Sequence, residues 1–310
     1  AFVSRWRGIV VALFIGAMIG LGQAPYGLFW VAFPALFAAF FLFRRIASRR
    51  QAFWFGGLIG AGVALVSMNW IVEPFLVDIG RHGWMAPIAM LLTAAGLGAF
   101  WGLGFWLGHR LGGRYLAMNL AVTLTAVEIL RSYALTGFPW GLTSYIWIDT
   151  PIYQLAAIVG PHGLTFLTLV TCAVGAWLAA GLRVGQSSGL RARWRYLSLA
   201  VLGFLAVSLW VVGNGPLSRL AGIAPDAPLI RLIQPNAPQD QKWDPEMMPV
   251  FYARQIEFTR AQVDITPDLI VWPEVAVPFL LNDPDAPFRD IVAAANGAMV
   301  IVGAQRLEDG

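Results

Sequence analysis

Residues 84–108, WMAPIAMLLTAAGLGAFWGLGFWLG, contain no Asp, Glu, Lys or Arg. A helix needs about 20 mainly apolar residues to cross the roughly 30 Å hydrocarbon core of a bilayer, and this run is long enough. The whole chain shares the bias, since 58% of its residues are hydrophobic and only 12% are charged. Soluble domains have roughly a quarter of their residues charged. The sequence therefore predicts an integral membrane protein.

Further apolar runs lie on both sides of this one. We predict about seven transmembrane helices, near residues 8–23, 27–43, 53–72, 84–108, 115–131, 163–182 and 196–213. Pro34 is expected to interrupt the second. A cleavable signal peptide is the alternative for the first, because a basic pair precedes its apolar run. No small-residue cleavage site stands before Pro25, however, and the next apolar run follows at once.

Arginines mark one side of the predicted helices. They cluster before the first span and in alternate connections after it, at positions 5, 7, 44, 45, 49, 50, 110, 114, 183, 191, 193 and 195. By the positive-inside rule these connections are cytoplasmic. An odd number of spans then places everything after residue 213 on the opposite side. Topology accounts for the net charge of +4, which gives no reason to expect a nucleic-acid partner.

The chain changes character after its last predicted span. We divide it into a transmembrane domain, residues 1–215, and a soluble α/β domain, residues 216–310. Apolar runs predict strands at 229–233, 268–272 and 299–303, and helical periodicity predicts helices at 245–263 and 287–295. This alternation implies parallel strands with right-handed crossovers. Three strands make a poor core, so we expect more of the sheet to lie outside these residues.

Glu274 ends the segment DLIVWPE, which starts at Asp268. Ligands of open α/β sheets bind beyond the carboxyl ends of the strands. A carboxylate just past a buried strand, next to an aromatic ring, is expected to be partly removed from water and to suit a general base. The alternative is an ordinary surface or helix-capping Glu.

Two soluble segments carry a family resemblance: LIVWPEVAVP at residues 269–278 and QPNAPQDQKW at residues 234–243. Three membrane segments accompany them: APYGLFW at 24–30, EILR at 128–131 and TGFPW at 136–140. Together they resemble the apolipoprotein N-acyltransferases, over essentially the whole chain. The resemblance implies a polytopic α-helical membrane domain followed by the first part of a nitrilase-like αββα domain.

The resemblance also implies a catalytic triad of Glu, Lys and Cys. Glu274 matches the general base, and Trp243 matches a tryptophan that the family places near its lipid-binding cleft. The catalytic Lys and Cys of the family lie further along the chain than Gly310, and so does its final span. We therefore expect a fragment or trimmed chain that is inactive by itself.

The function implied is transfer of an acyl chain from a glycerophospholipid, through a Cys thioester, to the N-terminal amine of diacylglyceryl-cysteine lipoproteins. The resemblance implies a multi-pass protein of the bacterial inner membrane whose soluble domain is periplasmic, and we expect a monomer. No cofactor is expected. A polytopic transporter, or a scaffold with a non-catalytic nitrilase-like tail, remains the alternative.

Several other residues need an interpretation. Cys172 lies within an apolar span, where a thiol behaves as a small hydrophobe rather than a nucleophile. Lys242, in a loop rich in Pro and Gln, is expected to be solvated. Single His residues at 82, 109 and 162 show no metal-ligand spacing, so no metal site is predicted.

Two further features lie at the ends of predicted spans. Glu128 and Arg131 share one helix face, and an intramembrane charge pair is a functional hypothesis by default. We favour a structural pair that fixes the following connection; Asn69 and Glu73 allow the same two interpretations. That connection, residues 132–162, is rich in aromatic residues, as expected for a membrane interface. Trp140 is our candidate there for substrate binding.

Overall fold

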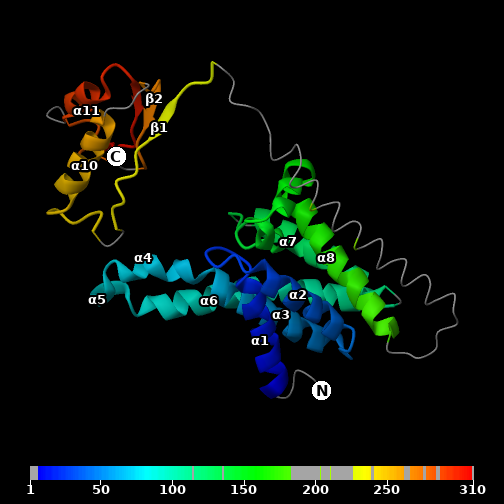
Figure 1. Cartoon of the computed structure of the whole chain (residues 1–310). Coiled ribbons are helices and arrows are strands. Elements are labelled where there is room, and N and C mark those ends of the chain that lie inside the picture. Colours follow the sequence, from blue (N-terminus) through cyan, green and yellow to red (C-terminus); the bar gives the residue numbers. More distant parts are fainter. Residues whose placement is uncertain are drawn as a thin grey trace. The chain divides into compact units, whose positions relative to one another are not determined.

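The computed structural model describes residues 6–182 except 114 and 135, the single residues 203 and 210, and residues 226–308 except 239–240, 262–265, 275–276 and 284–286. Two compact units are present: a helical unit, which holds most of residues 1–220, and an α/β unit formed mainly by residues 221–310 (Figure 1). The predicted span at 196–213 lies outside the described residues apart from two single positions. The predicted domain boundary at 215 lies outside them as well and stays a prediction.

Helices make up the described part of the helical unit. The first six predicted spans each coincide with a helix, although the ends differ by several residues. Pro34 lies inside α2 and does not interrupt it, so that expectation was wrong. In bounds, the elements are α1 (Trp6–Gly20), α2 (Phe29–Phe43), α3 (Arg49–Ser67), η1 (Asn69–Val72), α4 (Glu73–Leu76), α5 (Ile79–His82), α6 (Met85–Leu111), α7 (Leu116–Tyr133), η2 (Thr143–Trp147), η3 (Pro151–Leu155) and α8 (Ala156–Leu182).

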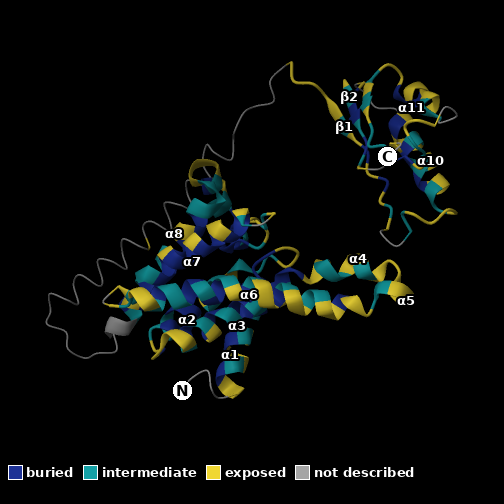
Figure 2. Ribbon diagram, turned by 180° about the vertical axis from the view of Figure 1, so that it is seen from behind, coloured by how far each residue is buried: buried dark blue, intermediate teal, exposed yellow. Residues whose placement is uncertain are grey.

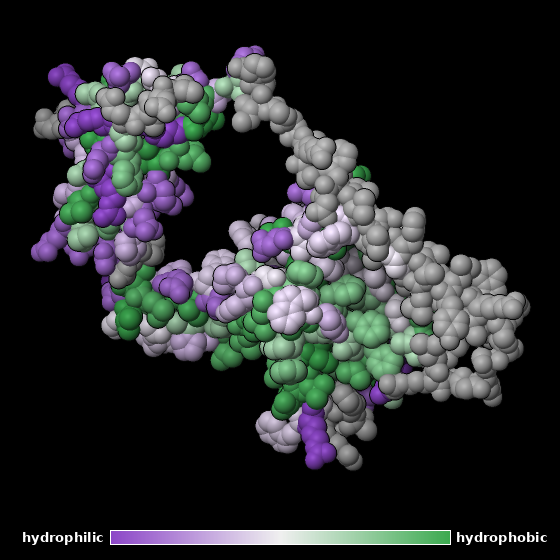
Figure 3. All heavy atoms as spheres, in the orientation of Figure 1, coloured by the Kyte–Doolittle hydropathy of each residue, from purple (hydrophilic) through white to green (hydrophobic). Residues whose placement is uncertain are grey.

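Length and composition identify the helices that can cross a membrane. Among the described residues, α6 and the segment Pro151–Ala179 qualify, and α3 joins them if it forms one span with Asn69–Leu76 across a bend of 66°. Two shorter apolar helices, α1 and α2, accompany them. Figure 3 shows mainly apolar side chains on the visible face of the helical unit and most of the hydrophilic ones on the α/β unit. The exact number of spans stays a prediction.

Glycines let the central helices approach one another closely. Helix α3 packs on both α1 and α6, and these are its most extensive contacts. A methyl group built on Gly98 of α6 would lie 2.6 Å from the carbonyl oxygen of Gly57 in α3. Small residues at membrane helix interfaces allow such backbone contact, which adds van der Waals packing where lipid supplies no hydrophobic driving force.

Three parallel strands form the sheet of the α/β unit, in the order β1 (Ile230–Leu232), β2 (Leu269–Val271) and β3 (Met299–Ile301). Helices α10 (Met248–Arg260) and α11 (Phe288–Ala295) form the two crossovers. The predicted strand–helix alternation and the parallel pairing are both confirmed. Side chains alternate across the sheet, so Ile270 packs into the core with α11 and part of α10, whereas Leu232 and Met299 stay exposed. Figure 2 shows buried and exposed stretches along the elements of this unit.

Candidate active site

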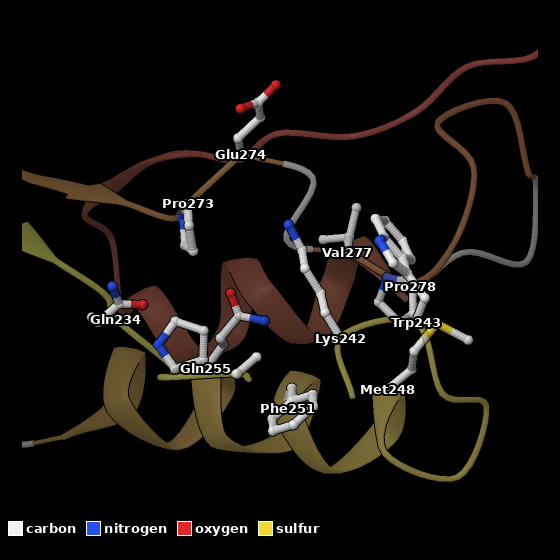
Figure 4. A pocket seen from close by; sticks show the side chains of 12 residues that line it. Gln234, Lys242, Trp243, Met248, Phe251, Gln255, Pro273, Glu274, Val277 and Pro278 are labelled. Atoms are coloured by element: carbon white, nitrogen blue, oxygen red, sulfur yellow. The ribbon is translucent and has the colours of Figure 1, made fainter. Parts of the chain in front are cut away.

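A pocket lies beyond the carboxyl ends of β1 and β2, with a cavity volume of about 160 Å³ (Figure 4). The parallel pairing of these strands brings together two segments that are distant in sequence. The lining residues are Gln234, Pro235, Ala237, Lys242, Trp243, Met248, Phe251, Gln255, Pro273, Glu274, Val277 and Pro278. Two of the sequence-predicted site residues, Glu274 and Trp243, therefore line the same pocket.

The loop after β1 is tied to helix α10. Arg254 Nη1 donates a hydrogen bond of 2.7 Å to the carbonyl oxygen of Pro235. Further along the loop, the Lys242 ammonium lies 5.3 Å from the centroid of the Trp243 ring. A cation over an aromatic face is attracted by the ring quadrupole. The loop thus presents a cation and an exposed indole at the pocket.

Trp272 holds the end of β2 in the core. Its side chain is buried, and Nε1 donates a hydrogen bond of 2.9 Å to Thr259 Oγ1 of α10. The ring also packs on Tyr252, with centroids 6.0 Å apart. Strand β2 ends at Val271, and Glu274 lies in a turn beyond it, so the side-chain alternation of the strand does not set the direction of Glu274.

Glu274 is exposed, so the expected removal of its carboxylate from water is not found. Figure 4 shows its carboxylate pointing away from Lys242 and Gln255. The aromatic neighbour on which that expectation depended is Trp272, which is turned into the core. The assignment of Glu274 as a general base stays a prediction.

Lys242 is less exposed than predicted. Instead of being fully solvated it is half-buried, lines the pocket and lies over Trp243. Phe251 and Gln255 also line the pocket but were not predicted from the sequence, and Gln255 is only 2% exposed. Residues four apart on a helix share a face. The spacing of Gln255 from Phe251 could therefore have indicated that both side chains of α10 line the pocket.

Glu128 and Arg131 are buried in the helical unit, 1% and 4% exposed. The Glu128 carboxylate accepts hydrogen bonds from the Thr143 hydroxyl (2.7 Å) and amide (3.1 Å). Arg131 Nη1 donates to the carbonyl oxygens of Phe138 (2.7 Å) and Trp140 (2.6 Å). Both charges therefore hold the connection that follows α7, as the structural interpretation expects, and a functional role of the pair stays a prediction.

The remaining candidates also belong to the helical unit. Trp140 is 53% exposed, and its ring centroid lies 5.3 Å from that of Phe138 and 6.4 Å from that of Trp70. Its role in substrate binding stays a prediction. Cys172 is buried in α8, as expected of a structural thiol. Within the described residues, no three His, Cys, Asp or Glu side chains gather as metal ligands.

The chain is similar in sequence to a known protein family. Residues 15–174 match the family model described as the apolipoprotein N-acyltransferase N-terminal domain. Relatives named apolipoprotein N-acyltransferase include those of Caulobacter vibrioides (32% identical over 98% of this chain and 57% of the relative), Brucella suis (30%, over 99% and 59%) and Pseudomonas syringae pv. tomato (33%, over 96% and 58%). The chain spans less than two thirds of the length of these relatives. Since the family model alone covers about half of the chain, the chain belongs to the apolipoprotein N-acyltransferase family.

Proposed function

We propose that the complete protein is a phospholipid:apolipoprotein N-acyltransferase. It takes an acyl chain from a glycerophospholipid and transfers it to the N-terminal amine of a diacylglyceryl-cysteine lipoprotein. The observation that carries the proposal is that Glu274, Lys242 and Trp243 line one pocket beyond the ends of two parallel strands. An apolar helical unit in the same chain and relatives that bear this enzyme's name support it.

The proposed chemistry has two acyl-transfer steps. Glu274 accepts the proton of a cysteine thiol, whose sulfur attacks the carbonyl carbon of the lipid ester. The ester C–O bond breaks, and the lysophospholipid leaves with that proton. In the second step Glu274 accepts a proton from the lipoprotein amine, which attacks the thioester, and the proton passes to the released thiolate. A covalent intermediate divides one difficult transfer into two easier ones.

The nucleophile of this proposal lies outside the 310 residues. Their single cysteine, Cys172, is enclosed in α8 of the helical unit and receives no catalytic role. The lysine that stabilises the tetrahedral intermediate is likewise assigned to the remaining part of the enzyme, rather than to Lys242. The reaction needs no cofactor, because both steps are acyl transfers without a change of oxidation state.

Trp243 and Trp140 are proposed as contacts for the lipid substrates. Both indoles are about half exposed, and tryptophan favours sites where an apolar body meets a polar boundary. In this proposal a bound substrate covers Glu274 and removes it from water, so that the base acts in a desolvated site. Because its substrates diffuse within a bilayer, we propose an enzyme of the bacterial inner membrane whose α/β unit is periplasmic. We propose that this enzyme acts as a monomer.

The experiment uses the complete protein in phospholipid vesicles with a diacylglyceryl-cysteine peptide, and mass spectrometry measures the N-acylated product. We expect Glu274→Gln to lower the rate by at least about 100-fold, since general acid–base catalysis contributes 10²–10⁴-fold. Glu246→Gln is the matched control, because Glu246 is exposed and does not line the pocket. A Glu274→Gln enzyme with the control's activity would refute the assignment of the base, and an unmodified peptide with the unaltered enzyme would refute the function.

A further inference from the structure

A second pocket, with a cavity volume of about 230 Å³, lies in the helical unit between the end of α2, the start of α7 and helix α8. It is lined by Arg44, Tyr115, Ala117, Met118, Ala173, Val174 and Trp177. Apart from the Arg44 guanidinium and the Tyr115 hydroxyl, every lining side chain is apolar. Among the described lining residues there is no Asp or Glu, so none of them offers Arg44 an acidic neighbour.

A hydrogen bond to helix α8 holds Arg44 at this pocket. Arg44 follows α2 directly, and its Nη1 donates a hydrogen bond of 2.6 Å to the carbonyl oxygen of Ala176 in α8. A guanidinium has five N–H donors in a fixed fork, and this bond accounts for one of them. The geometry of the group suits bidentate binding of a phosphate.

The pocket lies at the arginine-rich end of the helical unit. Arg45 also follows α2, Arg49 and Arg50 begin α3, and Arg110 is in the last turn of α6. A ring nitrogen of His109 lies 3.1 Å from the carbonyl oxygen of Ile46, which joins the end of α6 to the same connection. Basic pockets between membrane helices on the cytoplasmic side are sites for anionic lipid head groups.

This end is separate from the connection that carries Trp140. Helix α7 has 18 residues, begins beside the pocket at Leu116 and ends at Tyr133. At 1.5 Å per residue it spans about 27 Å. Arg131, near its far end, binds the carbonyl oxygen of Trp140. The pocket at Arg44 is therefore not the place where Trp140 is proposed to meet a substrate.

We propose that this pocket binds one anionic phospholipid of the surrounding leaflet. Arg44 binds the phosphate, and an acyl chain lies along Met118, Val174 and Trp177. The apolar lining favours a lipid over a soluble phosphate, because it offers van der Waals contact to an acyl chain that a soluble phosphate lacks. Because no carboxylate stands among the described lining residues, the guanidinium favours a net negative head group over a zwitterionic one. This binding is independent of the proposed acyl transfer.

The test is native mass spectrometry of the full chain, released from detergent after titration with phosphatidylglycerol or phosphatidylcholine. We expect a single phosphatidylglycerol adduct that exceeds the phosphatidylcholine adduct. Arg44→Gln should weaken phosphatidylglycerol binding about fivefold, the effect of one arginine on an anionic lipid surface. Arg45→Gln is the matched control: it removes the same charge one residue away, from an exposed side chain that lies over Phe41 and does not line the pocket.

A second variant keeps the test decisive if Arg44→Gln unfolds the protein. Val174→Trp fills the pocket without changing any charge, and it should lower phosphatidylglycerol binding while thermal unfolding stays cooperative. Arg44→Lys should retain the preference for the anionic lipid. The proposal fails if phosphatidylcholine binds equally well, if Arg45→Gln weakens binding as much as Arg44→Gln, or if Val174→Trp binds like the unaltered chain. Displacement of the lipid by soluble glycerol phosphate would also overturn it.

Discussion

Gly98 offers a sharp test of how tightly α6 packs on α3. A methyl group at this position would lie 2.6 Å from the carbonyl oxygen of Gly57, 3.2 Å from the amide nitrogen of Ala61 and 3.3 Å from its Cβ. The first two atoms belong to the backbone of α3, which has no rotamer with which to move aside. Gly98→Ala must therefore separate the two helices locally.

The required separation sets the size of the effect. Ordinary carbon–oxygen contact begins near 3.4 Å, so the backbones must move apart by roughly 0.8 Å, and a gap of this size forfeits a quarter to a half of the contact energy. Overpacking a close-packed interface costs about 1–3 kcal/mol. Helix propensity opposes this, since alanine is about 1 kcal/mol better than glycine in a helix. We expect a net loss of up to about 2 kcal/mol.

Two other glycines act as controls for that loss. Gly96 lies on the same helix, and a methyl group there would meet nothing within 4 Å. Gly57 faces Gly98 from α3, yet its methyl group would lie 3.5 Å from the nearest atom, the Gly98 carbonyl oxygen. Neither Gly96→Ala nor Gly57→Ala should destabilise the protein. The interface is thus expected to be asymmetric, with one of two facing glycines intolerant of alanine.

The assay is denaturant or thermal unfolding of the purified chain in one detergent, followed by circular dichroism. Gly98→Ala should unfold at a lower midpoint than the unaltered chain, while the Gly96 and Gly57 variants unfold at or above the original midpoint. If all three variants behave alike, helix propensity or the detergent dominates, and the argument from close backbone contact is refuted. Destabilisation by Gly57→Ala alone would contradict the geometry directly.

Two buried hydrogen bonds give further predictions. Thr143→Ala removes the hydroxyl that donates a hydrogen bond of 2.7 Å to the Glu128 carboxylate. Losing a hydrogen bond to a charged group should lower the free energy of unfolding by about 1.5–3 kcal/mol. Thr171 is half-buried and donates its described hydrogen bond to Leu167 of its own helix, so it should tolerate alanine in the same unfolding assay. Trp272→Phe breaks the bond to Thr259, so hydrogen–deuterium exchange of α10 amides should speed up several-fold; unchanged exchange there would show that the bond is dispensable.

Local patterns account for the elements of the α/β unit. Apolar runs ended by proline predicted β1 and β2, because proline cannot continue a hydrogen-bonded ladder. The strand Leu269–Val271 forms between Asp268 and Pro273, within one residue of the prediction at each end. The helix predicted between the two strands implied that they pair in parallel. Parallel pairing brings the carboxyl ends of both strands to one edge of the sheet, where Gln234 and Glu274 line one pocket. Chain topology alone was enough to locate the candidate site.

Side-chain direction was not available from the same patterns. The sequence placed Glu274 beside Trp272, and adjacency suggested that the ring shields the carboxylate. In the structure the ring nitrogen donates a hydrogen bond to Thr259 of α10, 13 residues earlier in the sequence. Pro34 gives the same lesson, because its expected effect on α2 was judged without the neighbouring helices. Membrane helices tolerate proline where surrounding groups compensate the lost hydrogen bond.

The buried charges of α7 show where such long-range partners could still be inferred. A carboxylate and a guanidinium in an apolar helix must find polar partners, because an unsatisfied charge there is expensive. Helix geometry turns Glu128 and Arg131 toward one side, and the connection after α7 is the nearest segment with carbonyl and hydroxyl groups to offer. The sequence therefore indicated that the loop is tied down, but not which of its atoms are bound.

That anchoring has a consequence for Trp140. Its carbonyl oxygen is fixed by Arg131, and its ring packs between Phe138 and Trp70. A residue on a free loop would lose conformational entropy when it binds a lipid, whereas this one has been ordered by folding. If Trp140 binds substrate, its affinity depends on Arg131, which touches no substrate in the proposal. Arg131 would then be a positioning residue, and its replacement should weaken lipid binding through the loop.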